Sequence, residues 1–287
     1  MNRIKTFLLL GLVTSLVIAF GARMGTGWLI AAIVGAFALN VGAYFWSHKL
    51  VLRMQGAQEL PEREAPWLHQ EVAELAARAG IPKPKVYLIP DDAPNAFATG
   101  RNPEHGVVAF TEGILRTMPR RELRGVIAHE LSHILHRDIL VATVAAGLAG
   151  AVSLLANVVQ WGALFGSSSQ DEEGGSHPFA GLLFALIAPI GASLIQFAIS
   201  RSREFMADEG AARLTQDPEG LALALQRLHR GQDLEEPGPT AQPATASLMI
   251  ASPFRGSGLM SWFSTHPPIE ARVARLVSMT PIRRNAA

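Results

Sequence analysis

Four long stretches without a charged residue constrain this chain more than any other feature of its sequence. A helix that spans a bilayer needs about 20 mostly apolar residues; two of the stretches comfortably exceed that length, and the first is marginal. The stretches are Thr6–Ala22, Thr26–Trp46, Ile139–Ser168 and Phe179–Ser200. A buried helix of a soluble protein could explain any one of them, and the last two could form a hairpin that enters the membrane only partly. Four together favour an integral membrane protein with about four transmembrane helices in a lipid bilayer.

The composition of the 287 residues supports that interpretation and excludes several other classes of protein. Only 17% of the residues are charged, whereas typical soluble domains have about 25%. An apolar fraction of 49% excludes intrinsic disorder, and the absence of cysteine excludes a disulfide-stapled secreted fold. A net charge of +1 gives no reason to expect a nucleic-acid partner. No G-x-x-x-x-G-K-[ST] loop is present, so we expect no nucleotide and no ATP-driven step.

The charges that border the four stretches predict their orientation, because Lys and Arg accumulate in short cytoplasmic loops. The loop between the third and fourth stretches has no Lys or Arg and contains Asp171, Glu172 and Glu173. The other ends are bordered by Arg3, Lys5, Lys49, Arg53, Arg201 and Arg203, with Arg23 as the exception. The first stretch could be a signal peptide, but a second follows after about four residues, which favours an uncleaved hairpin. We therefore expect both termini and both polar segments in the cytoplasm.

This pattern divides the chain into four consecutive parts. We expect an N-terminal transmembrane hairpin over 1–49, a polar segment over 50–138, a second hairpin over 139–200 and a second polar segment over 201–287. Each polar segment has about 90 residues, which is small for an independent domain. Because the second hairpin brings their ends together, the two segments are expected to form one composite domain.

The polar segments contain patterns of both helices and strands. Helices are expected at Pro66–Ala79, from Pro119 without a break into the third apolar stretch, and at Arg203–Leu214, Glu219–Arg230 and Ile269–Met279. Strands are expected at Lys85–Ile89, Ala96–Thr99 and Val107–Phe110, and a loop at Gly231–Thr245. The predicted fold class is therefore α+β, mainly α.

Residues 129–133 read His-Glu-Leu-Ser-His, the H-E-x-x-H pattern, on a predicted helix. At 100° per residue, His129 and His133 lie about 40° apart on one helix face and one turn apart in height. Both imidazoles can then reach one Zn²⁺ at about 2.0–2.1 Å. Glu130 projects beside them, where it can take a proton from a water activated by the metal. The alternative is a polar helix face with two ordinary histidines.

A catalytic zinc needs a third protein ligand and one open position. His136 shares the helix face but lies about 10 Å along the axis from His129, too far for one tetrahedral ion, so a supporting or interfacial role fits it better. Glu204 and Asp208 are four residues apart on another predicted helix. Glu204 could ligate zinc while Asp208 accepts the other N–H of a ligand imidazole. The alternative is a solvated acidic face that includes Glu209.

Four motifs make the chain similar to the HtpX-type membrane zinc metalloproteases, which are related to the CAAX prenyl proteases. They are His129–His133, Ser200–Asp208 (Ser-Arg-Ser-Arg-Glu-Phe-Met-Ala-Asp), Asn95–Gly100 (Asn-Ala-Phe-Ala-Thr-Gly) and Ser264–Pro268 (Ser-Thr-His-Pro-Pro). The resemblance covers nearly the whole chain. It implies a zincin-like (gluzincin) domain with one Zn²⁺ per chain, held by His129, His133 and Glu204, and Glu130 as the catalytic base. It also implies quality-control proteolysis of membrane proteins on the cytoplasmic side of a bacterial inner membrane, often under stress.

The remaining motifs suggest how a polypeptide substrate could be held. Asn95, Ala96, Phe97 and Ala98 are expected on an edge strand over the metal, to which a peptide can add as a further strand. His266 stands before two prolines and could donate to the oxyanion formed when water attacks the peptide carbonyl. Arg272 is the other candidate for that role, because the only tyrosines are Tyr44, in an apolar stretch, and Tyr87, in a predicted strand. Arg272 is also expected, with Asp208, to support the metal ligands from behind.

Three other functions fit the sequence less well than this hydrolase. A processing protease for one defined substrate, such as a lipid-modified C-terminus, would need a large chamber that four spans are too few to enclose. A membrane chaperone or scaffold with a structural zinc would have no use for Glu130 beside an open position. A transporter is disfavoured because the apolar stretches hold no Asp, Glu, Lys or Arg to mark a pathway.

Overall fold

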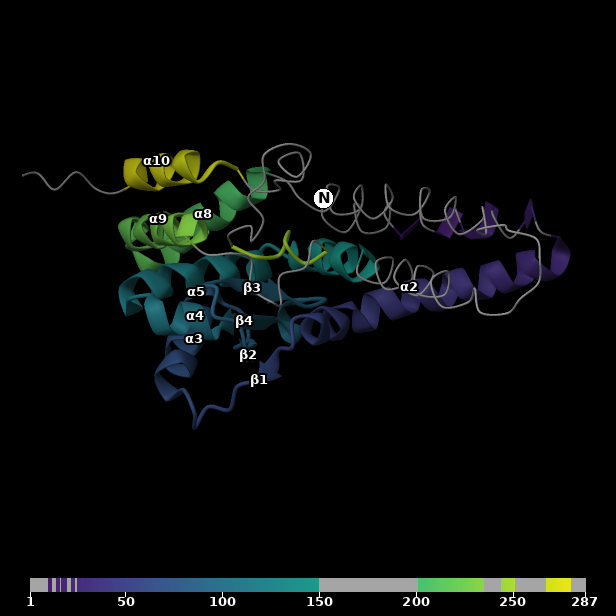
Figure 1. Cartoon of the computed structure of the whole chain (residues 1–287), viewed down its shortest axis with the longest axis horizontal. Helices are drawn as coiled ribbons and strands as arrows, with labels where there is room; N and C mark the ends of the chain where they lie inside the picture. Colours follow the sequence, from purple (N-terminus) through teal and green to yellow (C-terminus); the bar gives the residue numbers. More distant parts are fainter. Residues whose placement is uncertain are drawn as a thin grey trace, which may run out of the picture.

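The computed structural model describes residues 25–149, 201–234, 244–250 and 267–279, with a few positions between 10 and 23. The helices are α2 (Thr26–Met54), α3 (Pro66–Ala79), α4 (Glu112–Thr117), α5 (Arg120–Leu135), α8 (Arg201–Thr215), α9 (Pro218–Leu234) and α10 (Ile269–Met279), with a 3₁₀ turn at Pro103–His105. The strands are β1 (Gln58–Glu59), β2 (Lys85–Ile89), β3 (Ala96–Thr99) and β4 (Val107–Thr111). The described part is thus α+β and mainly helical, as expected (Figure 1).

The four strands form one small mixed sheet in the order β1-β2-β4-β3. β2 and β4 are parallel, whereas β3 runs antiparallel to β4 and β1 antiparallel to β2. The three strands predicted from the sequence are confirmed, and β4 extends one residue further, to Thr111. β3 therefore lies at an edge of the sheet, beside the helix that contains the H-E-x-x-H residues.

Both faces of this sheet are covered by apolar side chains. Val86, Val108 and Phe110 face a large core formed with α3, α5, α8, α9 and α10. Ile89, Phe97 and Ala109 face a second cluster with the end of α2 and Met249. Burial on both faces explains why these strands read as continuous apolar runs rather than alternating ones.

Helix α5 lies at the centre of the helical layer. It packs against α3 and β3 and also against α8 and α9, while α10 covers α8 and α9 on the outer side (Figure 1). Gly125 allows α9 to approach closely, because a Cβ at this position would lie 2.8 Å from the Cα of Leu221. Gly210 does the same for α8, because a Cβ there would lie 2.5 Å from Oγ of Ser132, so residues 120–135 and 201–215 lie side by side.

The expectation of one unbroken helix from Pro119 into the third apolar stretch is wrong. α5 ends at Leu135, and the next helix, Ile139–Ala149, is bent by 92° from it. Between them Arg137 has a φ of 55°, in the left-handed region where an α-helix cannot continue. The corner at Arg137–Asp138 therefore redirects the chain directly after the H-E-x-x-H residues.

Helix α9 also differs from its prediction at its C-terminal end. The expected loop began at Gly231, but the helix continues to Leu234. Gly231 weakens a helix by only about 1 kcal/mol relative to alanine, which the packing of α9 against α5 and α10 can offset. Residues 235–243 of the expected loop lie outside the described residues.

Helix α2 has 29 residues, begins at the second apolar stretch and continues past it to Met54. In Figure 1 it projects away from the sheet and the other labelled helices. Its surface exposes large apolar side chains, namely Trp28, Ile30, Ile33, Val34, Phe37, Tyr44, Phe45 and Trp46. Within the described residues it is the one helix long and apolar enough to cross a membrane. A second candidate exists if α5 and the helix Ile139–Ala149 are counted together as one bent span.

Candidate metal centre

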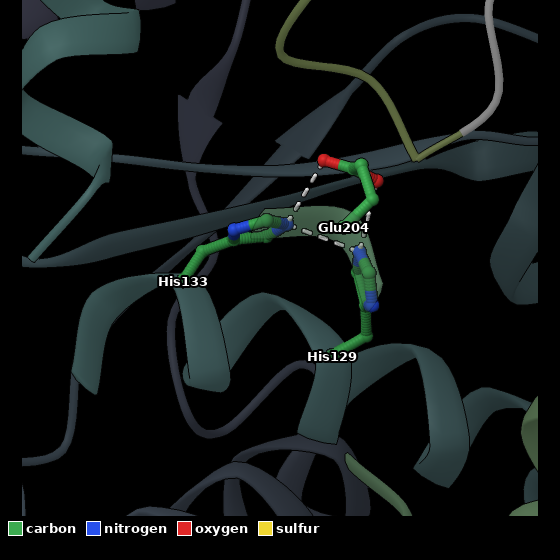
Figure 2. A group of neighbouring side chains, drawn as sticks. All are labelled: His129, His133 and Glu204. Atoms are coloured by element: carbon green, nitrogen blue, oxygen red, sulfur yellow. Dashed lines mark hydrogen bonds and ion pairs between the residues drawn. The ribbon is translucent and has the colours of Figure 1, made fainter. Parts of the chain in front are cut away.

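Helices α5 and α8 bring together three side chains that could hold a metal ion. His129 and His133 lie one turn apart on α5, and Glu204 projects toward them from α8 (Figure 2). The Nε2 atoms of the two histidines are 3.1 Å apart. Oxygen atoms of Glu204 lie 3.8 Å from Nε2 of His129 and 3.6 Å from Nε2 of His133.

These distances fit a small divalent cation. Ligand bonds of about 2.0–2.1 Å in a tetrahedral arrangement place the ligand atoms about 3.3 Å from one another. One ligand atom from each of the three residues lies within 4.8 Å of the others. Two imidazoles and one carboxylate are a donor set found in catalytic zinc sites.

Glu130 lies beside the three ligand candidates in a small cavity. The cavity has a volume of about 40 Å³, enough for at least one water molecule, and its walls include Ala98, His133 and Glu204. Oε1 of Glu130 is buried and has no hydrogen-bond partner among the described residues. Burial raises the pKa of Glu130 to about 8, and nearby His133 opposes that rise. A water in this cavity would meet a carboxylate of unusually high proton affinity.

A buried ion pair orients the first histidine. Oδ1 of Asp208 lies 3.0 Å from Nδ1 of His129. Arg272 donates to both oxygens of Asp208, from Nε at 2.9 Å and from Nη2 at 2.7 Å. Burial tends to raise the pKa of Asp208, but the charges and hydrogen bonds of Arg272 and His129 together outweigh it, and the pKa is lowered. Asp208 therefore stays ionised while fully buried.

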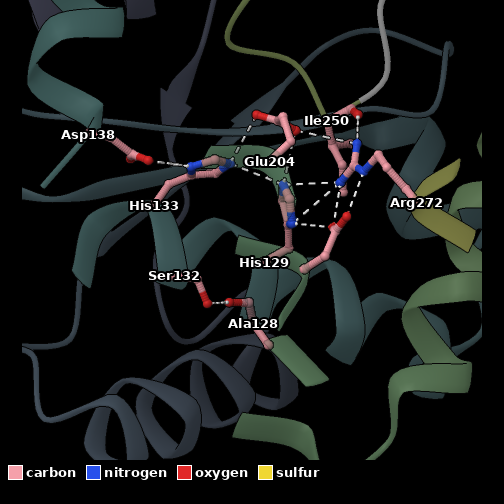
Figure 3. Close-up of polar contacts among 9 residues, drawn as sticks. Ala128, His129, Ser132, His133, Asp138, Glu204, Ile250 and Arg272 are labelled. Atoms are coloured by element: carbon pink, nitrogen blue, oxygen red, sulfur yellow. Dashed lines mark hydrogen bonds and ion pairs between the residues drawn. The ribbon is translucent and has the colours of Figure 1, made fainter. Parts of the chain in front are cut away.

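A second carboxylate, absent from the sequence-based prediction, contacts the other histidine. The oxygens of Asp138 lie 3.1 and 3.2 Å from Nδ1 of His133 (Figure 3). Burial lowers the pKa of His133, but the charge and hydrogen bond of Asp138, together with the charges of Glu204 and Glu130, outweigh burial, and the pKa rises to about 10. The sequence does show an acidic residue five positions after His133. Helical periodicity could not predict that its side chain points toward His133, because α5 ends at Leu135, before Asp138.

Comparison with known proteins connects this geometry to a family. The sequence pattern of peptidase family M48 matches residues 62–280, which contain all of these side chains. The chain belongs to peptidase family M48. It is accordingly a metalloprotease, a hydrolase of peptide bonds, and the predicted resemblance to HtpX-type proteases is confirmed by its relatives.

The similar M48 proteins extend over almost the full chain. It is 52% identical to a protease HtpX homolog of Paraburkholderia phytofirmans over 97% of both chains. It is 50% identical to protease HtpX homologs of Burkholderia ambifaria, over 97% of both chains, and of Syntrophobacter fumaroxidans, over 97% of this chain and 99% of the other. These relatives and the apolar α2 make it a membrane protein of the M48 family.

A solved structure shares the fold at low sequence identity. The crystal structure of S. mikatae Ste24p aligns with 96% of this chain at a TM-score of 0.53 and 18% identity. This M48 chain spans 65% of the length of that protein. At this identity the likeness supports the fold alone.

The substrate-binding strand expected in this M48 peptidase is only partly open at its outer edge. Ala98 lines the cavity, and its backbone N–H donates to Glu130. At Ala96 the edge is already occupied, because its carbonyl accepts from the N–H of Ile250 at 2.9 Å. The side chain of Asn95 turns back on the strand, where its Oδ1 accepts from the N–H of Ala96. Phe97 points into the core on the other face of the sheet. Of the four residues, the structure brings Ala98 to the cavity.

Three further candidates are placed differently or lie outside the described residues. Arg272 is fully buried against Asp208, and its Nη1 lies 3.4 Å from Glu204, so it contacts a candidate metal ligand rather than an open substrate site. His136 is the C-cap residue of α5 and belongs to no metal-binding group found among the described residues. His266 and the fourth apolar stretch lie outside those residues.

Proposed function

We propose that this chain is a zinc-dependent endopeptidase of a bacterial inner membrane that hydrolyses misfolded or damaged membrane proteins. The observation that carries the proposal is the convergence of His129, His133 and Glu204 beside a cavity that contains the buried carboxyl group of Glu130. The names of its relatives, protease HtpX homologs, point to the same chemistry.

The proposed metal site takes two ligands from α5 and one from α8. Nε2 of His129, Nε2 of His133 and a carboxylate oxygen of Glu204 would hold one Zn²⁺. Zinc in such a site supplies Lewis-acid polarisation of the peptide carbonyl and of the attacking water. Asp208 and Asp138 would hold the two imidazole rings with their Nε2 atoms toward the ion.

Glu130 is proposed as the general base and then the general acid. Its carboxylate takes a proton from the attacking water as the water oxygen bonds to the peptide carbon. The same carboxyl group then returns a proton to the leaving amine nitrogen as the C–N bond breaks. A raised pKa suits both transfers, because a carboxyl group near neutrality can accept and release a proton at working pH. His266 is proposed as the donor to the oxyanion.

Substrate main chain is proposed to pair with the edge of β3 through the carbonyl of Ala98, since the N–H of Ala98 donates to Glu130. In a further strand added to this edge, the scissile bond would lie over the cavity, because the backbone of Ala98 directly contacts Glu130. Main-chain pairing is tolerant of sequence, which suits an enzyme that clears unfolded polypeptides. The chain has no phosphate-binding loop, so we infer cleavage without ATP and without power to unfold stable substrates.

The membrane arrangement is proposed from the charge pattern and from α2. Hairpins over 1–49 and 139–200 would cross the bilayer, giving about four spans. The segments 50–138 and 201–287 would form one catalytic domain on the cytoplasmic side. The exposed apolar side chains of α2 support contact with lipid, and a catalytic site close to the bilayer would meet membrane-protein substrates first.

Replacement of the proposed base tests the hydrolase function. Glu130→Gln keeps the size of the side chain but removes the proton acceptor, so we expect cleavage of casein or an unfolded membrane protein to fall at least about 100-fold. Bound zinc, measured on the same detergent-solubilised protein, should stay at one per chain. Glu104→Gln, an exposed residue, is the matched control and should keep full activity. Equal cleavage rates for Glu130→Gln and Glu104→Gln would disprove the proposal.

A further inference from the structure

Asp138, at the corner between α5 and the helix Ile139–Ala149, is buried and contacts both neighbours: its main chain contacts the helix that follows, and its side chain contacts α5. The carbonyl of Asp138 accepts from the N–H of Ala142 at 3.4 Å, as the first residue before a helix does. Its side chain points the other way, to Nδ1 of His133. Only 4% of Asp138 is exposed. One residue thus joins the start of an apolar helix to a candidate metal ligand.

The helix that begins at this corner is held closely against α2. A Cβ on Gly147 would lie 3.0 Å from the Cβ of Ser47 and 3.4 Å from its Cα, so the two backbones are nearly in contact there. Val144 and Leu148 pack against Leu39 of α2 in a small apolar cluster. The position of α2 therefore fixes the position of Ile139–Ala149.

The same helix is also joined to the edge strand beside the cavity. Oγ1 of Thr143 lies 2.9 Å from Oγ1 of Thr99 at the end of β3, and it accepts from the N–H of Gly100 at 3.4 Å. All of these contacts are buried. A shift of the apolar helix would consequently move Asp138 and the end of β3 together.

We propose that Asp138 is a positioning residue through which the packing of the two apolar helices, α2 and Ile139–Ala149, sets the orientation of His133 and hence the affinity for the metal. The inference rests on the proposed metal site but goes beyond it, because it makes metal affinity depend on helix packing. Carboxylates that accept from ligand imidazoles typically contribute 10- to 100-fold to metal affinity.

The first part of the test measures Zn²⁺ binding without turnover. The full chain in detergent, stripped of metal, is titrated with Zn²⁺ against a chromogenic chelator. Asp138→Asn and Asp138→Ser both remain good helix-capping residues, but the first is uncharged and the second is too short to reach His133. Both should bind Zn²⁺ about 10- to 100-fold more weakly, while the melting temperature of the metal-free protein stays within a few degrees of the wild type.

The matched control for the charge is Asp92→Asn, an exposed carboxylate paired with Arg116. Its Zn²⁺ affinity should equal that of the wild type. If Asp138→Asn and Asp138→Ser also bind Zn²⁺ with wild-type affinity, Asp138 does not position His133 and the proposal is wrong. Because no substrate is used, this result is independent of whether Glu130→Gln abolishes cleavage.

The second part of the test separates the helices without touching the site. Gly147→Ala adds a methyl group against Ser47, whereas Gly35→Ala adds the same group to α2 where no atom lies within 4 Å. We expect Gly147→Ala to weaken Zn²⁺ binding several-fold and Gly35→Ala to leave it unchanged. The larger Gly147→Leu should weaken it further, relative to Gly35→Leu. Identical affinities for the Gly147 and Gly35 variants would overturn the coupling.

Discussion

At the residue scale, the two histidines on α5 lie in different electrostatic surroundings although they are one turn apart. Burial lowers the pKa of His129 to about 4; the hydrogen bond with Asp208 opposes that fall, whereas the charges of His133 and Arg272 add to it. His133 faces Asp138 and Glu204, and their charges raise its pKa to about 10. Arg272 therefore limits the negative charge around the site while Asp208 remains available to His129.

The buried pair of Asp208 and Arg272 should matter for stability as well as for ligand orientation. Removing one partner leaves an uncompensated buried charge, which costs about 3–5 kcal/mol. We expect Arg272→Met and Asp208→Asn each to lower the free energy of unfolding of the metal-free protein by an amount of that order. The double variant should lose clearly less than the sum of the two. Chemical denaturation of the four proteins checks this, and strictly additive losses would contradict it.

The sequence predicted the site residues that share a regular helix, but not the contacts that depend on a turn or on long-range packing. The spacing of His129, Glu130 and His133 on a helix defined their common face, and Glu204 and Asp208 followed from the same periodicity. Asp138 could not be predicted this way, because it follows a left-handed residue at the end of α5. The partner of Arg272 depended on long-range packing of α10 against α8, which no local pattern encodes.

At the element scale, short capping interactions fix the ends of the helices that surround the site. Asp217 precedes α9, and its Oδ1 accepts from the N–H of Gly220 at 3.2 Å. Its carboxylate also pairs with Arg121 at the start of α5, at 2.6 and 2.7 Å. One side chain thus joins the beginnings of two helices that pack side by side.

Substitutions of Asp217 should separate the cap from the ion pair. Asp217→Ala removes both and should cost about 0.5–2 kcal/mol, whereas Asp217→Asn retains the cap and should cost less. The hydrogen bond from Arg121 lowers the pKa of Asp217 below its ordinary value of 3.8. Since the folded-state pKa is depressed, the stabilisation is present above pH 3.8 and is lost as the pH falls through the folded value.

Thermal unfolding at several pH values measures this effect. The difference in melting temperature between the wild type and Asp217→Asn should be constant near neutrality and should shrink below about pH 4. A difference that grows as the pH falls would show that the carboxylate of Asp217 does not stabilise the folded state.

The elements themselves were predicted better than their connections. Strands β2 and β3 and helices α3 and α10 have the expected bounds, because apolar periodicity, Pro66 and Gly80 act locally. The bend after Leu135 was missed, because Arg137 gives no local signal of a left-handed conformation. Strand β1 was also missed, since its two exposed residues pair with β2 without an apolar pattern.

At the scale of the whole molecule, the small charged fraction reflects a chain made of two kinds of segment. Helix α2 has little burial and many exposed apolar side chains. Helices α5, α8 and α9 instead pack against one another and carry ion pairs such as Arg227–Glu122. The close packing of Gly147 on Ser47 joins the two apolar helices, and the contact of Thr143 with Thr99 joins the second of them to the sheet.

The proposed orientation in the membrane can be tested with single cysteines, because the chain has none of its own. In intact cells, a membrane-impermeant thiol reagent should label Asp171→Cys, in the acidic loop between the third and fourth apolar stretches. It should not label Arg63→Cys, which is exposed on the catalytic part, until the membrane is opened. Labelling of Arg63→Cys but not Asp171→Cys in intact cells would reverse the orientation.

The most direct measurement is an anomalous difference map recorded at the zinc absorption edge from crystals of the full chain. The account predicts one strong peak per chain, about 2.0–2.1 Å from Nε2 of His129, from Nε2 of His133 and from an oxygen of Glu204, with room for a water beside Glu130. A peak bound by other residues, such as Asp208 in place of Glu204, or no peak between α5 and α8 in zinc-loaded protein, would contradict it.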